Sequence, residues 1–530
     1  MSSSVCSALF AGAATLCLAA NAQIEDSGLQ MVDPWGMGFL EAGEPALPAS
    51  MWRASSTKTL LPMMRDVPTQ ALTPAERTLM RRMALSPANA PQGTESAELL
   101  AERARILFEL GEARPAASLM ARLDTPPPGL DSDEIATDLN LALGNEAMAC
   151  AENTAAPRDG AYWAMLRAVC AALRDNTTGA ELAIEIAASQ GVDDSWLTSA
   201  VFAASGELPN PPQARYDSGI ALAISAKAAL TPPSTPLSPT RPDLAAAMVA
   251  RPGLPPATRV EAAAIAAEAG LIDVAVWRQV LDSQFNDPEF TPESPIEIAI
   301  ATARNVGMPE DGRADAIAAA LQAAAVNPAR FVAVSKVLTK EITSLSLTRD
   351  TAKHALLFAR ASLAAKDFEG ATLWTLVPTL DEAPETRAFD FAMISGLAVL
   401  AGSGDAIETG ERLVTEADTK SDRKAAARLF ALWTMTGITP PPAARALMAT
   451  DSEVPGKTVK PGTVLAILAA ADQGAAGEVI LGTVALTNGD PSKLDTADLA
   501  LLGKALATIG AEGAASELAL EATGYWQAAK

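Results

Sequence analysis

A helix, a tight turn and a second helix recur along this chain at a spacing of about 34 residues. In ERARILFELGEARPAASLMARL and KALATIGAEGAASELALEA, an apolar helical stripe ends at Gly111 or Gly510, and a second helix opens with small residues. Glycine, asparagine and aspartate tolerate the left-handed backbone that ends a helix. One such hairpin cannot bury its apolar stripe alone, so neighbouring hairpins must stack. The recurrence therefore predicts an all-α chain.

The pattern predicts nine hairpin turns, and the last five of them are spaced by 36, 34, 37 and 36 residues. The predicted turns lie at Gly111, Gly144, Asn176, Gly270, Asp367, Ser403, Gly437, Gly474 and Gly510. Aromatic residues make up only 4% of the chain and alanine dominates its apolar residues. Alanine has the highest helix propensity, and its small side chain lets helices approach closely. Composition and spacing therefore favour the same architecture.

These segments resemble tetratricopeptide and SEL1-like repeats, on the basis of the small–Gly–x–Ala turn and the period. The resemblance implies an α-solenoid of helix-turn-helix repeats. More loosely, the LPASMW arm, the RTLMRRMALSP helix, AYWAMLRAVCAAL and VEAAAIAAEAG are similar to uncharacterised alanine-rich secreted proteins of proteobacteria. Some of those proteins carry an antifreeze-glycopeptide label. This second resemblance implies no catalytic residue.

The chain divides into five predicted parts. Prolines break the helical period before residue 70 and again between about 205 and 260, and proline is excluded from helix interiors. LTPAERTLMRRM predicts the first firm helix, with Thr73 as N-cap, Pro74 at the first helical position and Glu76 completing a capping box. The predicted parts are a signal peptide (1–22), an irregular arm (23–70), an N-terminal helical module (71–204), a Pro-rich interruption (205–260) and a C-terminal helical repeat array (261–530).

The N-terminus predicts export. Residues 5–20 form an apolar run, no charged residue precedes Glu25, and Ala20-Asn21-Ala22 offers small residues at both recognition positions of a signal peptidase. The alternative is a buried N-terminal helix. We expect a periplasmic or secreted protein of a Gram-negative bacterium, with no membrane span after cleavage.

Two cysteines survive this cleavage, Cys150 and Cys170. In an oxidising compartment two remaining cysteines usually pair. They lie on two helical stretches separated by a break at Pro157, which can fold back on each other. We therefore predict a disulfide, which would stabilise the fold by about 3 kcal/mol in the chain-entropy model. Two separate buried thiols are the alternative.

The sequence offers little chemistry. GKT at 456–458 lacks the earlier glycine of a phosphate loop, and Ser55-x-x-Lys58 stands without the companion motifs of serine–lysine enzymes. His354 is the single histidine, whereas catalytic zinc sites need several His or Cys ligands. We therefore predict no catalytic residue, no metal site and no cofactor. The net charge of −23 disfavours nucleic-acid binding.

The best ligand-facing candidates are Trp277, Trp374 and Trp433, which could line a concave groove. The alternative is that they fill the gaps that alanine leaves between helices. Our leading hypothesis is a non-enzymatic periplasmic scaffold that binds a protein or peptide partner of the cell envelope. The alternatives are a module of an envelope hydrolase and, with less support, an antifreeze-like stress protein.

Overall fold

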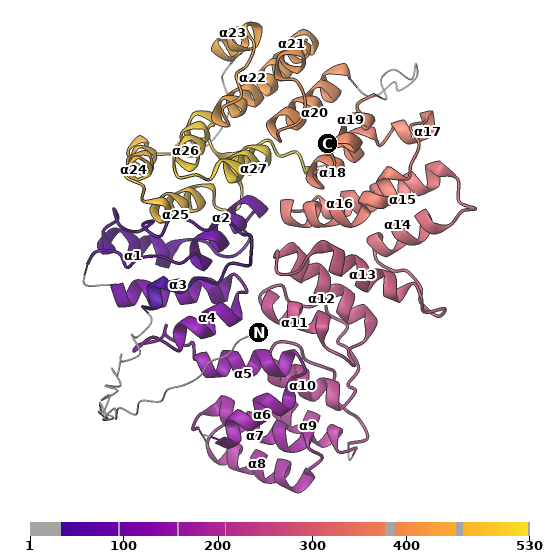
Figure 1. The fold of residues 1–530 in the computed structure, drawn as a ribbon. Helices are drawn as coiled ribbons and strands as arrows, with labels where there is room; N and C mark the ends of the chain where they lie inside the picture. The colour runs from indigo at the N-terminus through magenta and orange to yellow at the C-terminus, as the bar shows by residue number, and fades with distance from the viewer. Residues whose placement is uncertain are drawn as a thin grey trace, which may run out of the picture. The chain divides into compact units, whose positions relative to one another are not determined.

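The computed structural model describes residues 33–93, 96–155, 158–206, 208–376, 387–451 and 459–527. The predicted signal peptide (1–22), the beginning of the predicted arm and the GKT segment lie outside the described residues. The described residues form helices and no strand, apart from an isolated bridge between Ser56 and Gln92. The all-α prediction is confirmed (Figure 1).

Most helices are short, of two to four turns. The described helices are α1 (Thr57–Asp66), α2 (Pro74–Leu85), α3 (Ser96–Glu109), α4 (Ala113–Met120), α5 (Ser132–Ala142), α6 (Glu146–Ala155), α7 (Ala161–Leu173), α8 (Thr177–Ser189), α9 (Ser195–Ala204), α10 (Gly219–Lys227), α11 (Pro242–Ala250), α12 (Pro256–Glu268), α13 (Val274–Gln284), α14 (Pro295–Arg304), α15 (Glu310–Ala324), α16 (Pro328–Thr343), α17 (Arg349–Ala352), α18 (Ala355–Ala364), α19 (Phe368–Trp374), α20 (Ala388–Leu400), α21 (Ala406–Glu416), α22 (Lys420–Met435), α23 (Pro442–Asp451), α24 (Pro461–Asp472), α25 (Ala476–Thr487), α26 (Thr496–Thr508) and α27 (Glu512–Ala522). The described residues also form 3₁₀ turns at η1 (Pro34–Gly36) and η3 (Pro491–Lys493).

Successive helices pack as antiparallel pairs, as the hairpin pattern predicts. The packed pairs include α3 with α4, α7 with α8, α12 with α13, α20 with α21, and α26 with α27. Neighbouring pairs then stack through helices such as α18, α20 and α22. Six predicted turn glycines have the positive φ that ends the first helix, namely Gly111, Gly144, Gly270, Gly437, Gly474 and Gly510. The sequence therefore identifies these turns correctly.

The other three predicted turns are displaced by one residue. The positive φ belongs to Asp175, Lys366 and Gly402, each directly before the predicted position. Asn176 and Asp367 are instead the N-caps of α8 and α19. Each side-chain oxygen accepts a hydrogen bond from a backbone N–H three residues later. At the N-cap, the side-chain oxygen accepts from a backbone N–H of the first turn that would otherwise have no partner. At the end of the preceding helix the unpaired groups are carbonyls, so the same oxygen would satisfy none of them.

The N-terminal arm is attached to the body by buried groups. Helix α1 lies within the segment for which we expected irregular structure, and it accommodates Pro62. Trp35 and Trp52 are both buried. Arg103 of α3, which is 1% exposed, donates hydrogen bonds to four backbone carbonyls, including those of Trp35 and Met37. This guanidinium therefore helps to fix the course of the arm, together with backbone hydrogen bonds such as that from Phe39 to Leu85.

The proline-rich segment between 205 and 260 contributes helices to the core. The helix expected at IALAISAKAAL is present as α10, which packs against α5, α7 and α9. Helix α11 packs against α5 and α12, with Pro242 in its first turn. Proline is tolerated there because the first turn has no intrahelical partner for its N–H. This segment therefore connects the helices before and after it.

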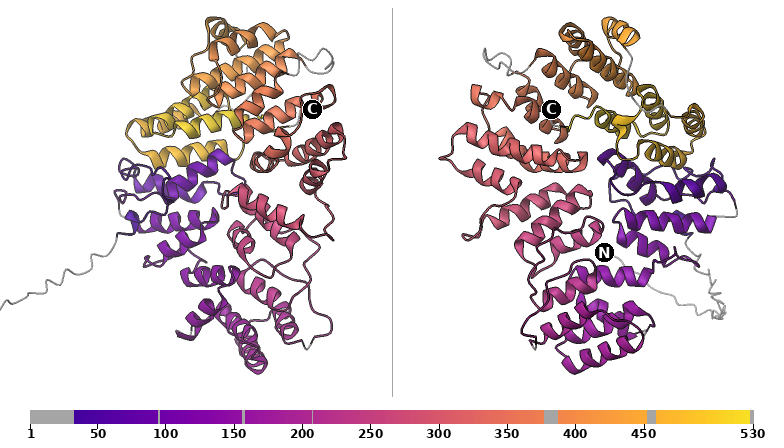
Figure 2. Two further views of the ribbon diagram at one scale, coloured as in Figure 1. Left: turned by 45° about the vertical axis from the view of Figure 1, so that its right-hand side comes forward. Right: turned by 180° about the vertical axis from the view of Figure 1, so that it is seen from behind.

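The first helices of the chain pack against the last. Helix α1 contacts α25, and α2 contacts both α25 and α27, so the indigo and yellow segments lie side by side (Figures 1 and 2). The predicted capping box of Thr73 and Glu76 is confirmed at the start of α2. The Glu76 carboxylate, which is 0% exposed, also accepts hydrogen bonds from the hydroxyl of Thr487 and the backbone N–H of Gly489. A buried polar network thus joins the two ends of the helical array.

Candidate ligand-binding site

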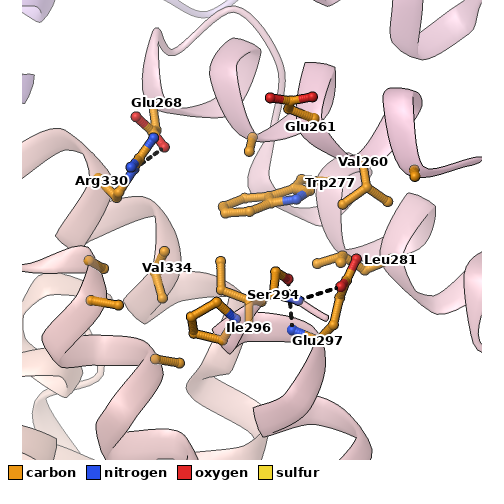
Figure 3. A pocket seen from close by; sticks show the side chains of 16 residues that line it. Val260, Glu261, Glu268, Trp277, Leu281, Ser294, Ile296, Glu297, Arg330 and Val334 are labelled. Carbon is orange, nitrogen blue, oxygen red and sulfur yellow. Dashed lines mark hydrogen bonds and ion pairs between the residues drawn. The ribbon is translucent and has the colours of Figure 1, made fainter. Parts of the chain in front are cut away.

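A cavity of about 370 Å³ lies between α12, α13, α14, α15 and α16 (Figure 3). Its walls contain five alanines from α12 and α15, namely Ala257, Ala264, Ala320, Ala323 and Ala324. These methyl groups are too short to fill the space that the larger side chains of α13 and α16 hold open. The cavity therefore follows directly from the alanine-rich composition.

The interior of this pocket is mainly apolar. The indole of Trp277, from α13, lies across it and is 1% exposed, while Val260, Ile296 and Val334 lie around the same space (Figure 3). The indole Nε1 of Trp277 has no hydrogen-bond partner among the described residues. A pocket with an aromatic wall and few polar groups is typical of sites that bind an apolar group.

Polar groups at the start of α14 fix one wall of the pocket. Ser294 and Glu297 form a capping box, in which the Glu297 carboxylate accepts from the backbone N–H of Ser294 at 2.9 Å and of Glu293 at 3.1 Å. In the amide orientation that satisfies its neighbours, buried Gln284 donates to Glu297 and accepts from the N–H of Ala257. These hydrogen bonds connect α12, α13 and α14. They also satisfy the carboxylate of Glu297.

The rim of the pocket is acidic. Glu268 accepts a hydrogen bond from the Nε of Arg330 at 2.8 Å, and burial raises the pKa of Glu268 while this hydrogen bond opposes the rise. Glu261 accepts from the backbone N–H of Leu237 at 2.8 Å. Arg330 is therefore the only cation among the residues that line this pocket, against three carboxylates.

The three tryptophans that we singled out occupy different surroundings. Trp277 lines the pocket. Trp374 is 3% exposed and packs on Phe358, with ring centroids 4.9 Å apart. Trp433 is 0% exposed, and its Nε1 donates to the carbonyl of Gly396 at 3.0 Å. These last two rings fill space between helices.

The disulfide between Cys150 and Cys170 is present, with the two Cα atoms 5.6 Å apart. It joins α6 to α7, and both cysteines are buried in a cluster that includes Trp163 and Leu166. This cluster is separate from the main core. The prediction of a disulfide is therefore confirmed, in preference to two buried thiols.

Little else in the described residues suggests chemistry. His354 precedes α18, and its Nε2 lies 2.6 Å from a carboxylate oxygen of Asp315. Lys353 and His354 hydrogen-bond to Asp315 and lower the pKa of its carboxyl. Within the described ranges, no group of three His, Cys, Asp or Glu side chains is placed to hold a metal ion. None of the described helices combines the length and apolarity that a membrane span requires.

No protein-family model matches the chain, and no curated protein and no solved structure matches it either. Sequence reasoning identified Trp277 but missed the other wall residues of the pocket. Alanines and single aliphatic residues on five helices have no local signal that would gather them around one cavity.

Proposed function

We propose that this chain is a non-enzymatic binding protein of the cell envelope, and that it holds an apolar side chain of a protein or peptide partner in the pocket between α12 and α16. The observation that carries the proposal is the pocket itself. Its volume of about 370 Å³ and its Trp277 wall suit one large apolar side chain. Stacked helix pairs, as in tetratricopeptide-like arrays, offer surfaces suited to extended segments.

The charge around the pocket indicates which segment would bind. Glu261 and Glu268 lie at the rim, and the whole chain carries a net charge of −23. Opposite charges on two binding partners accelerate their encounter, and like charges disfavour the binding of other partners. The preferred partner segment is therefore an apolar anchor residue flanked by lysine or arginine.

The alternative of an envelope hydrolase has less support at this pocket. The carboxylates of Glu261 and Glu297 each accept a backbone hydrogen bond, and that of Glu268 is paired with Arg330. A general acid or base needs a carboxyl group free to reach a substrate proton. These carboxylates instead hold the pocket walls.

The proposal is tested by selecting a displayed library of random peptides on the full-length chain. The expected consensus is an aromatic or leucine anchor next to basic residues. Ala323 lines the pocket from an exposed position, so Ala323→Phe should fill the mouth and weaken the selected peptides by about tenfold or more. The neighbouring exposed residue gives a matched control, Gln322→Phe, which lies outside the lining and should bind normally. Absence of any enriched peptide, or equal binding by both variants, would contradict the proposal.

Placement in the envelope rests on the N-terminal pattern of residues 1–22 and agrees with the disulfide. Cell fractionation with thiol labelling tests it. The chain should lack residues 1–22 and should react with the label only after reduction. A cytoplasmic chain with two free thiols would contradict this placement.

A further inference from the structure

A second and larger cavity, of about 720 Å³, lies where distant parts of the chain meet. Its walls come from several segments that are distant in the sequence. These are α2 and the loop before it, the C-terminal ends of α3 and α12, residues 239–242 at the start of α11, the turn before α16 and the first turn of α16, the loop after α25, and residues 526–527. The cavity therefore exists only because the first and last helices pack together. It shares Glu268 and Arg330 with the apolar pocket.

The carboxylates in the wall of this cavity already have partners. Glu109 accepts hydrogen bonds from the hydroxyl of Thr69 at 2.7 Å and from Arg105 at 2.6 Å. Glu268 is paired with Arg330, and Asp490 accepts a hydrogen bond from the backbone N–H of Ser492 and forms an ion pair with Lys493. The acidic side chains of the wall are thus neutralised by neighbouring donors.

Arg77 differs from these groups, because its guanidinium has no hydrogen bond or ion pair among the described residues. It is half-buried, and its Cδ lies 4.0 Å from the position that a Cβ would take at Gly270, so the side chain reaches from α2 to the end of α12. Burial and the neighbouring charge of Arg81 lower the pKa of Arg77, while Glu112 acts in the opposite direction. Glu112 is itself hydrogen-bonded to Arg81 at 2.6 Å.

Further donors face the same space. The Nε of Arg330 donates to Glu268, whereas its two terminal nitrogens make no hydrogen bond among the described residues. Gln70 and Asn488 also line the cavity, and each carries an amide with two N–H donors. An unpaired, partly desolvated cation beside spare donors is best satisfied by a ligand that brings negative charge and acceptor oxygens.

We propose that this cavity is a binding site for a small ligand bearing a carboxylate or phosphate group, which Arg77 and Arg330 hold by charge-assisted hydrogen bonds. A guanidinium is suited to such planar or tetrahedral oxyanions because its donors form a rigid fork. The proposal does not rest on the peptide pocket, since its anchoring cation, Arg77, does not line that pocket, although Arg330 lines both.

The test is a titration of the full-length chain with citrate and, separately, with inorganic phosphate. Both are followed by calorimetry and by thermal unfolding at constant ionic strength, with sodium chloride as the reference. We expect saturable binding and a rise of the unfolding temperature with at least one of the two anions. Citrate alone would indicate a carboxylate ligand, and phosphate alone a phosphate ligand. A wild-type chain that binds neither anion above the sodium chloride reference would overturn the proposal, whatever the variants do.

The variant Arg77→Gln keeps the stem of the side chain as far as Cδ and a polar end, and it removes the charge. It should fold with unchanged or higher stability in the absence of anions, because the lost cation has no partner, and it should bind the anion about tenfold or more weakly. Arg53 is exposed and lies outside the cavity, so Arg53→Gln matches the change in net charge and should bind normally. If both variants bound the anion equally weakly, the loss would be due to net charge alone, and the assignment of Arg77 as the anion-binding residue would be overturned.

Discussion

Glu521 of α27 makes the contact between the two ends of the chain sensitive to pH. Its side chain is buried, and one carboxyl oxygen accepts from the backbone N–H of Ala75 at 2.9 Å, in the first turn of α2. The other oxygen has no hydrogen-bond partner among the described residues. Burial raises the pKa of Glu521 to about 8, although the neighbouring Thr73 hydroxyl and the Ala75 N–H oppose the rise, and the charges of Glu76 and Glu517 add to it.

The direction of the effect follows from the two protonation states. A glutamate of ordinary pKa, 4.5, has lost its proton in the unfolded chain at any pH above that value, whereas Glu521 keeps its proton in the folded chain up to about pH 8. The folded state therefore binds more protons over this interval, so the free energy of unfolding falls as the pH rises. Each pH unit in this interval lowers the free energy of unfolding by about 1.36 kcal/mol. The total loss between pH 4.5 and 8 is therefore at most about 5 kcal/mol. Below the interval the contribution to stability is fully present, and above it the contribution is lost.

The substitution Glu521→Gln isolates this effect. The glutamine oxygen can still accept from Ala75, but the side chain cannot ionise. Urea unfolding at pH 6 and pH 8.5 should show the wild-type chain losing up to about 3 kcal/mol more than the variant. Glu512 lies exposed on the same helix, so Glu512→Gln is the control and should follow the wild type. If the wild type and Glu521→Gln show parallel pH dependence, Glu521 is already ionised in the folded chain and the reasoning is refuted.

Further substitutions test three individual contacts. Replacing Cys150 and Cys170 by serine should lower the free energy of unfolding by about 3 kcal/mol, and a reductant should destabilise the wild type but not the variant in urea unfolding. Arg103→Met should lower the free energy of unfolding by about 3 kcal/mol or more in the same assay, because four backbone carbonyls lose their donor. A loss below about 1 kcal/mol would show that water replaces the guanidinium as the donor. Gly477→Ala should lower the thermal midpoint, because a Cβ there would lie 2.1 Å from the Trp52 ring, and Trp52→Phe should recover part of the loss if this clash is the cause.

The local architecture could be predicted because its causes are local. The capping box of Thr73 and Glu76, the left-handed turn at Gly111 and the pairing of Cys150 with Cys170 all depend on residues close together in the sequence. The displaced turn at Asn176 is instructive, since asparagine favours both a left-handed turn and an N-cap. The preceding Asp175 adopts the left-handed conformation and leaves Asn176 to cap α8.

The contact between the chain ends could not be predicted in this way. Ala75 and Glu521, and likewise Glu76 and Thr487, are separated by more than 400 residues. The sequence predicts Glu76 as a capping residue but not as a buried one, and Glu521 looks like an ordinary surface glutamate of a helix. Their burial becomes evident only when α2 is placed against α25 and α27. The second cavity depends on the same packing and is equally absent from any local pattern.

The Arg330–Glu268 pair relates the two proposed sites to one another. Both residues line the apolar pocket as well as the larger cavity, and their side chains are joined by a 2.8 Å hydrogen bond. An anion that draws the Arg330 guanidinium toward the larger cavity would weaken its hold on Glu268. The rim of the apolar pocket would then carry a less neutralised carboxylate and would attract a basic segment more strongly. Because coupling between two binding sites is reciprocal, a basic segment at Glu268 would equally release Arg330 toward the anion.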